Sequence, residues 1–347
     1  MRILVTGGAG FIGSAFVRLM LGSPGSVEIL NFDKLTYAGN LENVEAVAGD
    51  PRYQFVRGDI CDAAAVESVF AEFRPDAVVH FAAESHVDRS ILSPLPVFET
   101  NLRGTFTLLE AARAARTGRF VHVSTDEVYG SLEAPAVADE RFPLRASSPY
   151  SAAKAGSDLL ALSYFTTYRL PVLVTRASNN YGPYQFPEKL IPLMIANAVE
   201  GKPLPVYGDG MQVRDWLYVD DHCRGIAAVL ERGAEGEIYN IGGTRSLPNI
   251  EVVRRILEAT GADPNLIRYV TDRPGHDRRY ALSSAKLERE AGWAPQVDFE
   301  AGLRETVRWY REHAGWVERV RSGAYQEYYA RNYGAREVAT GAAPQSS

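Results

Sequence analysis

The sequence predicts an α/β protein built on a doubly wound parallel sheet, followed by a smaller C-terminal α/β lobe. Through the first half of the 347-residue chain, short apolar runs alternate with segments of helical periodicity, as in βαβ units. A glycine-rich turn at residues 7–13 also follows the first apolar run and opens a helical segment. Together these observations predict a Rossmann-type fold.

The elements of the first half follow one another in a regular rhythm. The apolar runs predict strands and the segments between them predict helices, because these connections have the length of a crossover helix. The predicted strands are residues 2–6, 27–32, 53–57, 76–81, 119–124 and 171–175. The predicted helices are residues 13–21, 63–73, 94–115 and 149–168.

After about residue 180 the turn signals become denser. We therefore predict a first domain over residues 1–180 and a smaller, substrate-binding lobe over residues 181–334, some segments of which return to the first domain. The small and polar residues 335–347 predict a disordered tail. The lobe's expected helices are residues 188–200, 221–231, 249–260 and 300–313, with strands at 204–207 and 237–240.

Composition narrows the class of protein. With 46% hydrophobic and 23% charged residues the chain can bury a large core, and its net charge of −6 gives no basic field for nucleic acid. Cys61 and Cys223 form no CxxC pair and the six histidines show no ligand pattern, so we expect no disulfide framework and no metal. No apolar run reaches the ~18 residues of a membrane span, and the first residues resemble a strand more than a signal peptide. We expect a cytoplasmic protein.

Gly7, Gly10 and Gly13 lie three residues apart between the first strand and the first helix. Such a turn lets the backbone approach a pyrophosphate, which the helix N-terminus then binds through free N–H groups. A plain strand–helix connection is the alternative. Asp33 ends the second strand, where a carboxylate can accept both hydroxyls of an adenosine ribose and repel a 2′-phosphate. The two features predict NAD rather than NADP.

Two further segments follow predicted strands at the same edge of the sheet. Asp59 and Ile60 come after the third strand, where an adenine edge would lie. The segment FAAES (81–85) comes after the fourth strand, and its small residues would let a cofactor pass close to the backbone. Both are candidate cofactor contacts.

Tyr150 and Lys154 stand four residues apart in a predicted helix and so share one face. A nearby ammonium stabilises phenolate and is expected to lower the pKa of the tyrosine from about 10 toward neutral pH. Such a tyrosine can take the proton of a sugar alcohol while its hydride leaves for a nicotinamide. An ordinary amphipathic helix with an exposed lysine is the alternative.

Asp126 and Glu127 follow the fifth strand, at the end of which ligands bind in open α/β sheets. Neighbouring carboxylates can take different pKa values, so that one stays protonated as an acid and the other ionised as a base. Two capping or solvated acids are the alternative. The position of the pair, ahead of Tyr150 and Lys154, favours a functional role.

The sequence resembles the extended short-chain dehydrogenase/reductase superfamily and, within it, dTDP-glucose 4,6-dehydratases. The resemblance runs from residue 1 to about residue 310. The glycine turn and YxxxK mark only the superfamily, whereas Thr-Asp-Glu is more specific, because epimerases of the same build usually have small or hydroxyl residues at Asp126 and Glu127. The matching segments are GGAGFIG (7–13), FAAES (81–85), STDEVYG (124–130), YSAAK (150–154), SNNYGPYQFPEKLIP (178–192) and RDWLYVDDH (214–222).

The resemblance implies a redox cycle that leaves tightly bound NAD unchanged. Tyr150 would take the proton of the sugar's 4-hydroxyl as hydride passes to NAD⁺, with Thr125 bonded to the 4-oxygen. Glu127 would then remove the proton on carbon 5, and Asp126 would protonate the departing 6-hydroxyl. Water leaves and hydride returns to carbon 6, which gives dTDP-4-keto-6-deoxyglucose for deoxysugar biosynthesis.

The resemblance also implies the residues that bind each molecule. For NAD these are Gly7, Gly10, Phe11, Ile12, Gly13, Asp33, Lys34, Leu35, Thr36, Asp59, Ile60, Phe81, Ala82, Ala83, Ser85, Thr100, Tyr150, Lys154 and Asn180. For the nucleotide sugar they are Ser85, Thr125, Asn179, Lys189, Leu190, Pro205, Val206, Tyr207, Arg214, Asn249, Arg273 and His276.

Two other functions stay open at this point. One is a 4-epimerase or decarboxylase acting on a UDP- or GDP-sugar, against which Asp126 and Glu127 argue, because epimerisation needs no acid or base at carbons 5 and 6. The other is a catalytically silent NAD-binding scaffold or sensor, against which the intact Tyr150 and Lys154 argue. The resemblance further implies a homodimer formed through a four-helix bundle of the helices near residues 94–115 and 150–168.

Overall fold

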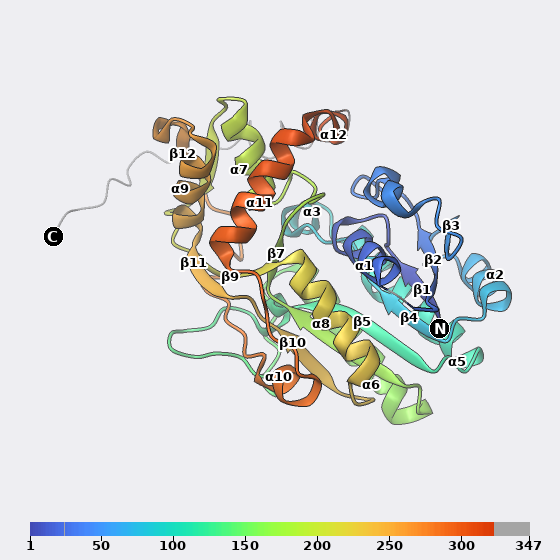
Figure 1. Cartoon of the computed structure of the whole chain (residues 1–347). Coiled ribbons are helices and arrows are strands. Elements are labelled where there is room, and N and C mark those ends of the chain that lie inside the picture. Colours follow the sequence, from blue (N-terminus) through green and yellow to red (C-terminus); the bar gives the residue numbers. More distant parts are fainter. Residues whose placement is uncertain (24, 323–347) are drawn as a thin grey trace.

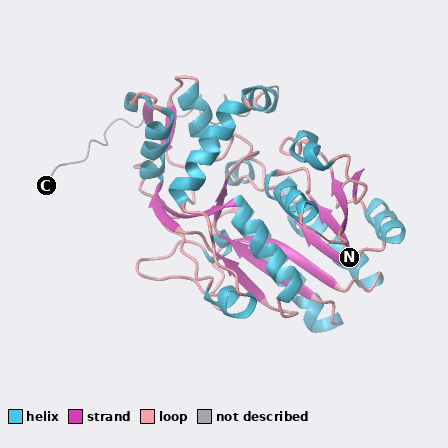
Figure 2. Cartoon of the chain, viewed as in Figure 1, coloured by secondary structure: helices cyan, strands magenta, loops and turns pink. Residues whose placement is uncertain are grey.

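The computed structural model describes residues 1–23 and 25–322, so the predicted tail at 335–347 lies outside the described residues. A seven-stranded, fully parallel sheet forms the centre (Figures 1 and 2). Its order, β10-β6-β5-β4-β1-β2-β3, confirms the predicted doubly wound fold. The strands are β1 (Arg2–Thr6), β2 (Glu28–Asp33), β3 (Tyr53–Arg57), β4 (Ala77–His80), β5 (Arg119–Thr125), β6 (Val172–Ala177) and β10 (Ile238–Ile241).

Helices cover both faces of this sheet. Successive strand side chains point to opposite faces, so in β1 Ile3 and Val5 pack into one core and Leu4 into the other. The first core lies under α1 (Phe11–Gly22), α8 (Val219–Arg232) and α10 (Ala285–Ala291). The second lies under α2 (Ala63–Phe73), α5 (Thr105–Ala114) and α6 (Pro149–Tyr168).

The winding of the sheet reverses between β1 and β4, which are neighbours in the sheet. At such a point the loops after the two strands diverge and leave a crevice at the carboxyl ends of the strands. Because these strands are parallel, the glycine turn after β1 lies at the same edge as the segments that follow β4 and β5. The fold therefore places the predicted site residues of the first half at one edge.

Helix α6 begins at Pro149, as the sequence predicts, because Ser148 caps it. The Ser148 hydroxyl accepts a hydrogen bond from the Ser151 N–H at 3.1 Å, and the Ser151 hydroxyl accepts one from the Ser148 N–H at 3.0 Å. Proline at the first helical position suits the required φ. The cap fixes Tyr150 and Lys154 in the first two turns, where both side chains are buried.

The segment predicted as one helix over 94–115 is instead built in three parts. Helix α4 (Leu95–Phe98) runs into a π-helical segment, η2 (Glu99–Gly104), and then into α5. Asn101 explains the wider turn, because its side chain accepts from the Glu84 N–H and donates to the Glu84 carbonyl, both at 2.9 Å. These bonds tie the segment to the loop after β4, next to the cavity described below.

The second lobe has two small sheets, β11-β9-β7 and β12-β8, that pack with helices around a separate core. Four of its strands, at residues 179–181, 213–218, 245–248 and 267–270, were not predicted. The strands are β7 (Asn179–Tyr181), β8 (Leu204–Tyr207), β9 (Val213–Tyr218), β11 (Arg245–Pro248) and β12 (Ile267–Val270). The helices are α7 (Leu190–Val199), α9 (Asn249–Thr260), α11 (Phe299–Glu312) and α12 (Ala314–Val320).

The chain returns to the large sheet after β9. Helix α8 packs on α1, and β10 then extends the sheet by pairing in parallel with β6. Short elements complete the described chain: α3 (Val87–Leu92) and the 3-10 helices η1 (Leu41–Val47), η3 (Asp126–Tyr129) and η4 (Pro264–Leu266).

A buried ion pair sits beneath the end of β5. Arg176 on β6 donates from Nε to Asp158 of α6 at 2.8 Å and from Nη1 to the Tyr129 hydroxyl at 3.0 Å. The Tyr129 hydroxyl donates in turn to Asn240 of β10 at 2.8 Å. This network joins α6, β6 and β10 directly below the segment that carries the predicted acid pair.

Candidate active site

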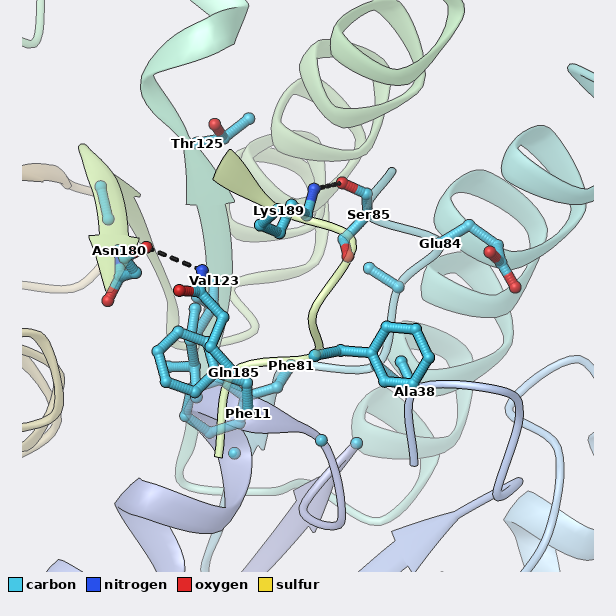
Figure 3. A pocket seen from close by; sticks show the side chains of 18 of the residues that line it. Phe11, Ala38, Phe81, Glu84, Ser85, Val123, Thr125, Asn180, Gln185 and Lys189 are labelled. Carbon is cyan, nitrogen blue, oxygen red and sulfur yellow. Dashed lines mark hydrogen bonds between the residues drawn. The ribbon is translucent and has the colours of Figure 1, made fainter. Parts of the chain in front are cut away.

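A cavity of about 350 Å³ opens at the carboxyl ends of the strands, on the crevice side of the sheet (Figure 3). Thirty-nine residues line it, and they include the five predicted catalytic residues. Of the predicted NAD residues, Leu35 is absent from the described lining; its backbone N–H instead donates to the Asp33 carboxylate at 2.8 Å. The lining NAD residues are Gly7, Gly10, Phe11, Ile12, Gly13, Asp33, Lys34, Thr36, Asp59, Ile60, Phe81, Ala82, Ala83, Ser85, Thr100, Tyr150, Lys154 and Asn180.

The glycine turn is shaped so tightly that side chains cannot replace its hydrogens. A Cβ on Gly13 would lie 2.2 Å from the Gly7 carbonyl oxygen, and one on Gly7 would lie 2.6 Å from the Ala82 nitrogen. Gly7 also has a φ of +72°, which favours glycine. Helix α1 starts directly after Gly10, with no side chain capping its first N–H groups. The turn thus offers a cradle and free donors suited to an anion.

Asp33 lies at the end of β2 on the same cavity. Its carboxylate accepts hydrogen bonds from the backbone N–H groups of Ala9, at 2.9 Å, and Leu35, at 2.8 Å. Burial raises the pKa of Asp33, and these two bonds oppose the rise. The carboxylate is therefore oriented from both sides, which suits an acceptor for ribose hydroxyls. At the rim, Lys34 and Asp59 form an ion pair at 2.7 Å.

Asp126 and Glu127 begin the short helix η3, whose first turn Thr125 caps by accepting from the Glu127 N–H at 3.3 Å. Burial, and next the Glu127 carboxylate, raise the pKa of Asp126 well above its usual range. Burial also raises the pKa of Glu127, but three cations oppose that rise: Arg273, Lys189 and Arg214. The environments therefore differ in the direction the chemistry needs, with Asp126 favoured as the protonated partner.

The expected lowering of the Tyr150 pKa does not occur in this structure. Burial, and next the Glu127 carboxylate, raise the pKa of Tyr150 above its ordinary value. The Lys154 ammonium donates to the Val123 carbonyl oxygen at 2.7 Å, and burial lowers its pKa to about 8. The sequence argument counted the charge of Lys154 but not the loss of water around both side chains, and the second effect is larger here.

A second cavity, of about 140 Å³, adjoins the first. Glu127 lines both, whereas Asp126 lines only the first, so Glu127 lies where the two spaces meet. The other residues that line both are Asn179, Glu188, Lys189, Leu190 and Trp216. Of the predicted substrate residues, Ser85 and Thr125 line the first cavity. The others line the second: Asn179, Lys189, Leu190, Pro205, Val206, Tyr207, Arg214, Asn249, Arg273 and His276.

Cationic side chains from the second lobe border the smaller cavity. Arg214 of β9 is buried, with its guanidinium 4.3 Å from the Tyr280 ring centre, and its Nη2 donates to the Asp277 carbonyl at 2.9 Å. Arg273 donates from Nη1 to the Asp88 carboxylate at 3.1 Å. The other oxygen of Asp88 accepts from the Tyr207 hydroxyl at 2.7 Å. Two oriented guanidinium groups at one cavity fit a diphosphate.

The structure also places residues in the lining that the sequence argument missed. One of them, Gln185, donates to the Asn180 carbonyl at 2.9 Å (Figure 3). On the same loop, the predicted Lys189 donates to the Ser85 carbonyl at 2.6 Å (Figure 3). The sequence FPEKL (186–190) could have pointed to Glu188, because a carboxylate next to a predicted ligand-binding lysine is itself a candidate site residue. The missed residues include Ala38, Gly39, Glu84, Gln185, Phe186, Glu188, Trp216 and His222.

His80 and His122 are buried in β4 and β5, as core histidines. Burial lowers the pKa of both, so both are neutral, and each contacts hydroxyl groups. Among residues 1–23 and 25–322, no group of three or more His, Cys, Asp or Glu side chains is placed to hold a metal ion. None of the described helices is both long and apolar enough to cross a membrane.

Residues 4–306 match the family described as GDP-mannose 4,6 dehydratase. A dTDP-glucose 4,6-dehydratase of Shigella flexneri is 52% identical, over 97% of this chain and 100% of that protein. The crystal structure of the dTDP-glucose 4,6-dehydratase of Streptomyces venezuelae with NAD bound has a TM-score of 0.90 and 55% identity, over 92% of this chain and 100% of that one. A Thermus thermophilus UDP-glucose 4-epimerase, also with NAD, is more distant, at 36% identity and a TM-score of 0.83, over 90% of this chain and 100% of that one. The chain therefore belongs to the GDP-mannose 4,6 dehydratase family and, within it, to the dTDP-glucose 4,6-dehydratases.

Proposed function

We propose that the protein converts dTDP-glucose to dTDP-4-keto-6-deoxyglucose and water, in deoxysugar biosynthesis, by an internal redox cycle with bound NAD. The observation that carries this proposal is the acid pair in the larger cavity, with Glu127 also bordering the smaller one and with environments that favour a proton on Asp126. In this proposal residues 1–180 bind NAD and carry the chemistry, while residues 181–334 mainly bind the nucleotide sugar.

The larger cavity fits NAD by the chemistry of its donors. The glycine cradle would receive the pyrophosphate, and Asp33 would hold the adenosine ribose. Lys34, Asp59 and Ile60 would border the adenosine, and Phe81 to Ala83 would flank the middle of the dinucleotide. Lys154 bonds to Val123 of β5, and β5 and the β2 strand that ends at Asp33 lie on opposite sides of β1 in the sheet. Tyr150 and Lys154 would therefore face the nicotinamide end. When bound, NAD accepts hydride from carbon 4 of the sugar and returns it to carbon 6.

The side chains of this chain would supply the proton transfers. Tyr150 takes the proton of the 4-hydroxyl, with Lys154 nearby as a cation and Thr125 as a hydrogen-bond partner of the 4-oxygen. The ketone at carbon 4 acidifies the hydrogen on carbon 5, which Glu127 removes. Asp126 donates its proton to the departing 6-hydroxyl. Each such proton transfer contributes about 10²–10⁴-fold to the rate.

Mass spectrometry tests the function directly. The purified protein is incubated with dTDP-glucose and no added cofactor. We expect the loss of one water per sugar nucleotide with no net formation of NADH. An unchanged mass with altered sugar configuration would instead show a 4-epimerase, and a reaction with only UDP- or GDP-sugars would overturn the substrate. Bound NAD with no conversion of any nucleotide sugar would support a sensor.

We also propose that the protein is a homodimer formed through α6 and the helical segment 95–114. These helices pack on each other, and they present large apolar side chains to solvent, which is unusual for a surface. The exposed fractions are 67% for Leu95, 42% for Phe98, 47% for Phe106 and 59% for Leu159. Sedimentation of the purified protein should give twice the mass of one chain, and Leu95→Glu combined with Leu159→Glu should give one chain's mass. A monomer in the unaltered protein would refute the proposal.

We propose a cytoplasmic location, where NAD and nucleotide sugars are available together. Fractionation of producing cells should recover the dehydratase activity with cytoplasmic marker enzymes, and recovery with an extracellular or membrane fraction would contradict the proposal.

A further inference from the structure

A buried carboxylate, Glu188, joins three separate segments that border the two cavities. Its side chain is only 2% exposed. Oε1 accepts a hydrogen bond from the Tyr37 hydroxyl at 3.0 Å, and Oε2 accepts one from Arg89 Nε at 3.1 Å. These partners come from positions 151 and 99 residues away in the chain, so the contacts are tertiary.

Two of these segments line the larger cavity. Tyr37 belongs to the loop after Asp33, which contributes Ala38 and Gly39 to the lining, and Glu188 lines it together with the preceding Gln185 and Phe186. Arg89 lies on α3, whose Val87 and Asp88 line the smaller cavity. Glu188 lines both cavities. Figure 3 shows the Ala38 and Gln185 sides of the larger cavity in one view.

The cluster around Glu188 is densely packed. The Arg89 guanidinium lies 3.9 Å from the centre of the Tyr37 ring, and the Phe186 ring meets that ring edge-on at 5.5 Å. His86 Nε2 lies 3.4 Å from the Glu188 carbonyl oxygen and 4.0 Å from its Oε2. Burial, and next Glu188, raise the pKa of Tyr37 well above its ordinary value, so its hydroxyl keeps the proton that it donates.

We propose that Glu188 is a positioning residue that holds the 34–40 loop, α3 and the 182–188 loop together, and so slows the release of NAD between turnovers. The inference rests on the proposed function, since it concerns the same cofactor. Glu188 touches neither of the proposed reacting groups. Separating these segments breaks two hydrogen bonds to a buried carboxylate, and bonds to charged groups are the stronger kind. The bond from the adjacent Lys189 to Ser85 ties the same loop to the FAAES segment.

Tyr37→Phe is the most informative variant, because it removes one hydroxyl and leaves the ring to pack under Arg89. We expect NAD to exchange about tenfold faster than in the unaltered protein, since one hydrogen bond to a charged group is lost. Glu188→Gln keeps the shape of the side chain and removes its charge, and it should act in the same direction. Tyr53→Phe is the matched control, because the Tyr53 hydroxyl accepts from Asn31 at 2.9 Å and Tyr53 lies outside the described cavity lining.

The measurement is the exchange of bound NAD for isotope-labelled NAD, followed by mass spectrometry after rapid desalting, with thermal unfolding in parallel. Faster exchange in Tyr37→Phe, with slow exchange and a similar Tm in Tyr53→Phe, supports the proposal. Unchanged exchange in Tyr37→Phe overturns it, even if Glu188→Gln fails to fold. An unaltered protein that binds no NAD would instead overturn the proposed function, and the inference with it.

Discussion

Replacing Asp126 with Asn is expected to slow the loss of water by about 10²–10⁴-fold. Burial and the Glu127 carboxylate raise the pKa of Asp126, which favours the protonated carboxyl that can give its proton to a poor leaving group. Its Oδ2 has no hydrogen-bond partner among the described residues, so that oxygen is available to bond a substrate. Asparagine has the same shape but no acidic proton. The oxidation at carbon 4 should continue, because it does not use this group.

Deuterium exchange separates the acid from the base. In D2O, Asp126→Asn should still place deuterium on carbon 5 of the sugar, because Glu127 remains able to take that proton. Glu127→Gln, the matched variant, should show neither exchange nor loss of water. Mass spectrometry of the recovered sugar nucleotide measures both events. If Asp126→Asn stopped the exchange and Glu127→Gln allowed it, the two roles would be reversed.

Replacing Tyr150 with Phe is expected to slow the whole reaction by about 10²–10⁴-fold, because the first oxidation loses its proton acceptor. Burial and the Glu127 carboxylate both raise the pKa of Tyr150, so they disfavour the phenolate that must take the proton. The buried Lys154 ammonium lies one turn along α6 and donates to the Val123 carbonyl oxygen at 2.7 Å. With its pKa at about 8, Lys154 loses its charge as the pH rises through that value.

A second substitution makes the Tyr150 test specific to one step. In Glu127→Gln the oxidation at carbon 4 should proceed and stall, so the near-ultraviolet absorbance of reduced nicotinamide should appear in a single turnover. Adding Tyr150→Phe should remove that signal. NAD content after acid release and the Tm show whether the double variant is still folded and loaded. Persistence of the absorbance in the double variant would exclude Tyr150 as the required acceptor.

The sequence predicted the large sheet well, because strands buried on both faces are nearly continuous apolar runs. Helix α6 was predicted to the residue, since Ser148 and Pro149 are strong local start signals. Three strands of the second lobe were missed because three or four residues carry too little periodicity. The six-residue β9 was missed because Arg214 and Asp215 interrupt its apolar pattern. The π-helical segment at 99–104 escaped for another reason, namely that the Asn101 side chain bonds to a distant loop.

The site shows the same division. Gly13, Asp33 and the Tyr150–Lys154 pair were found because each has a fixed spacing within one stretch of chain. The contact of Glu188 with Tyr37 spans 151 residues, so no local pattern contains it. The pKa direction at Tyr150 depends on burial, which is a property of the folded surroundings. Local motifs therefore predicted residues that line the cavity, whereas the tertiary contacts around them had to be seen in three dimensions.

The return of β10 to the large sheet has a consequence for how this chain matures. While the protein is being synthesised, β6 presents an unpaired, apolar edge until residues 238–241 have emerged. A fragment that stops near residue 180 would keep that edge open and invite aggregation. The second lobe is built from several separate stretches of chain, because α8, β10 and α10 lie between those stretches and belong to the first core. Replacing the lobe with that of a relative would therefore require exchanging each stretch separately. The large sheet is therefore complete only when both halves of the chain are present.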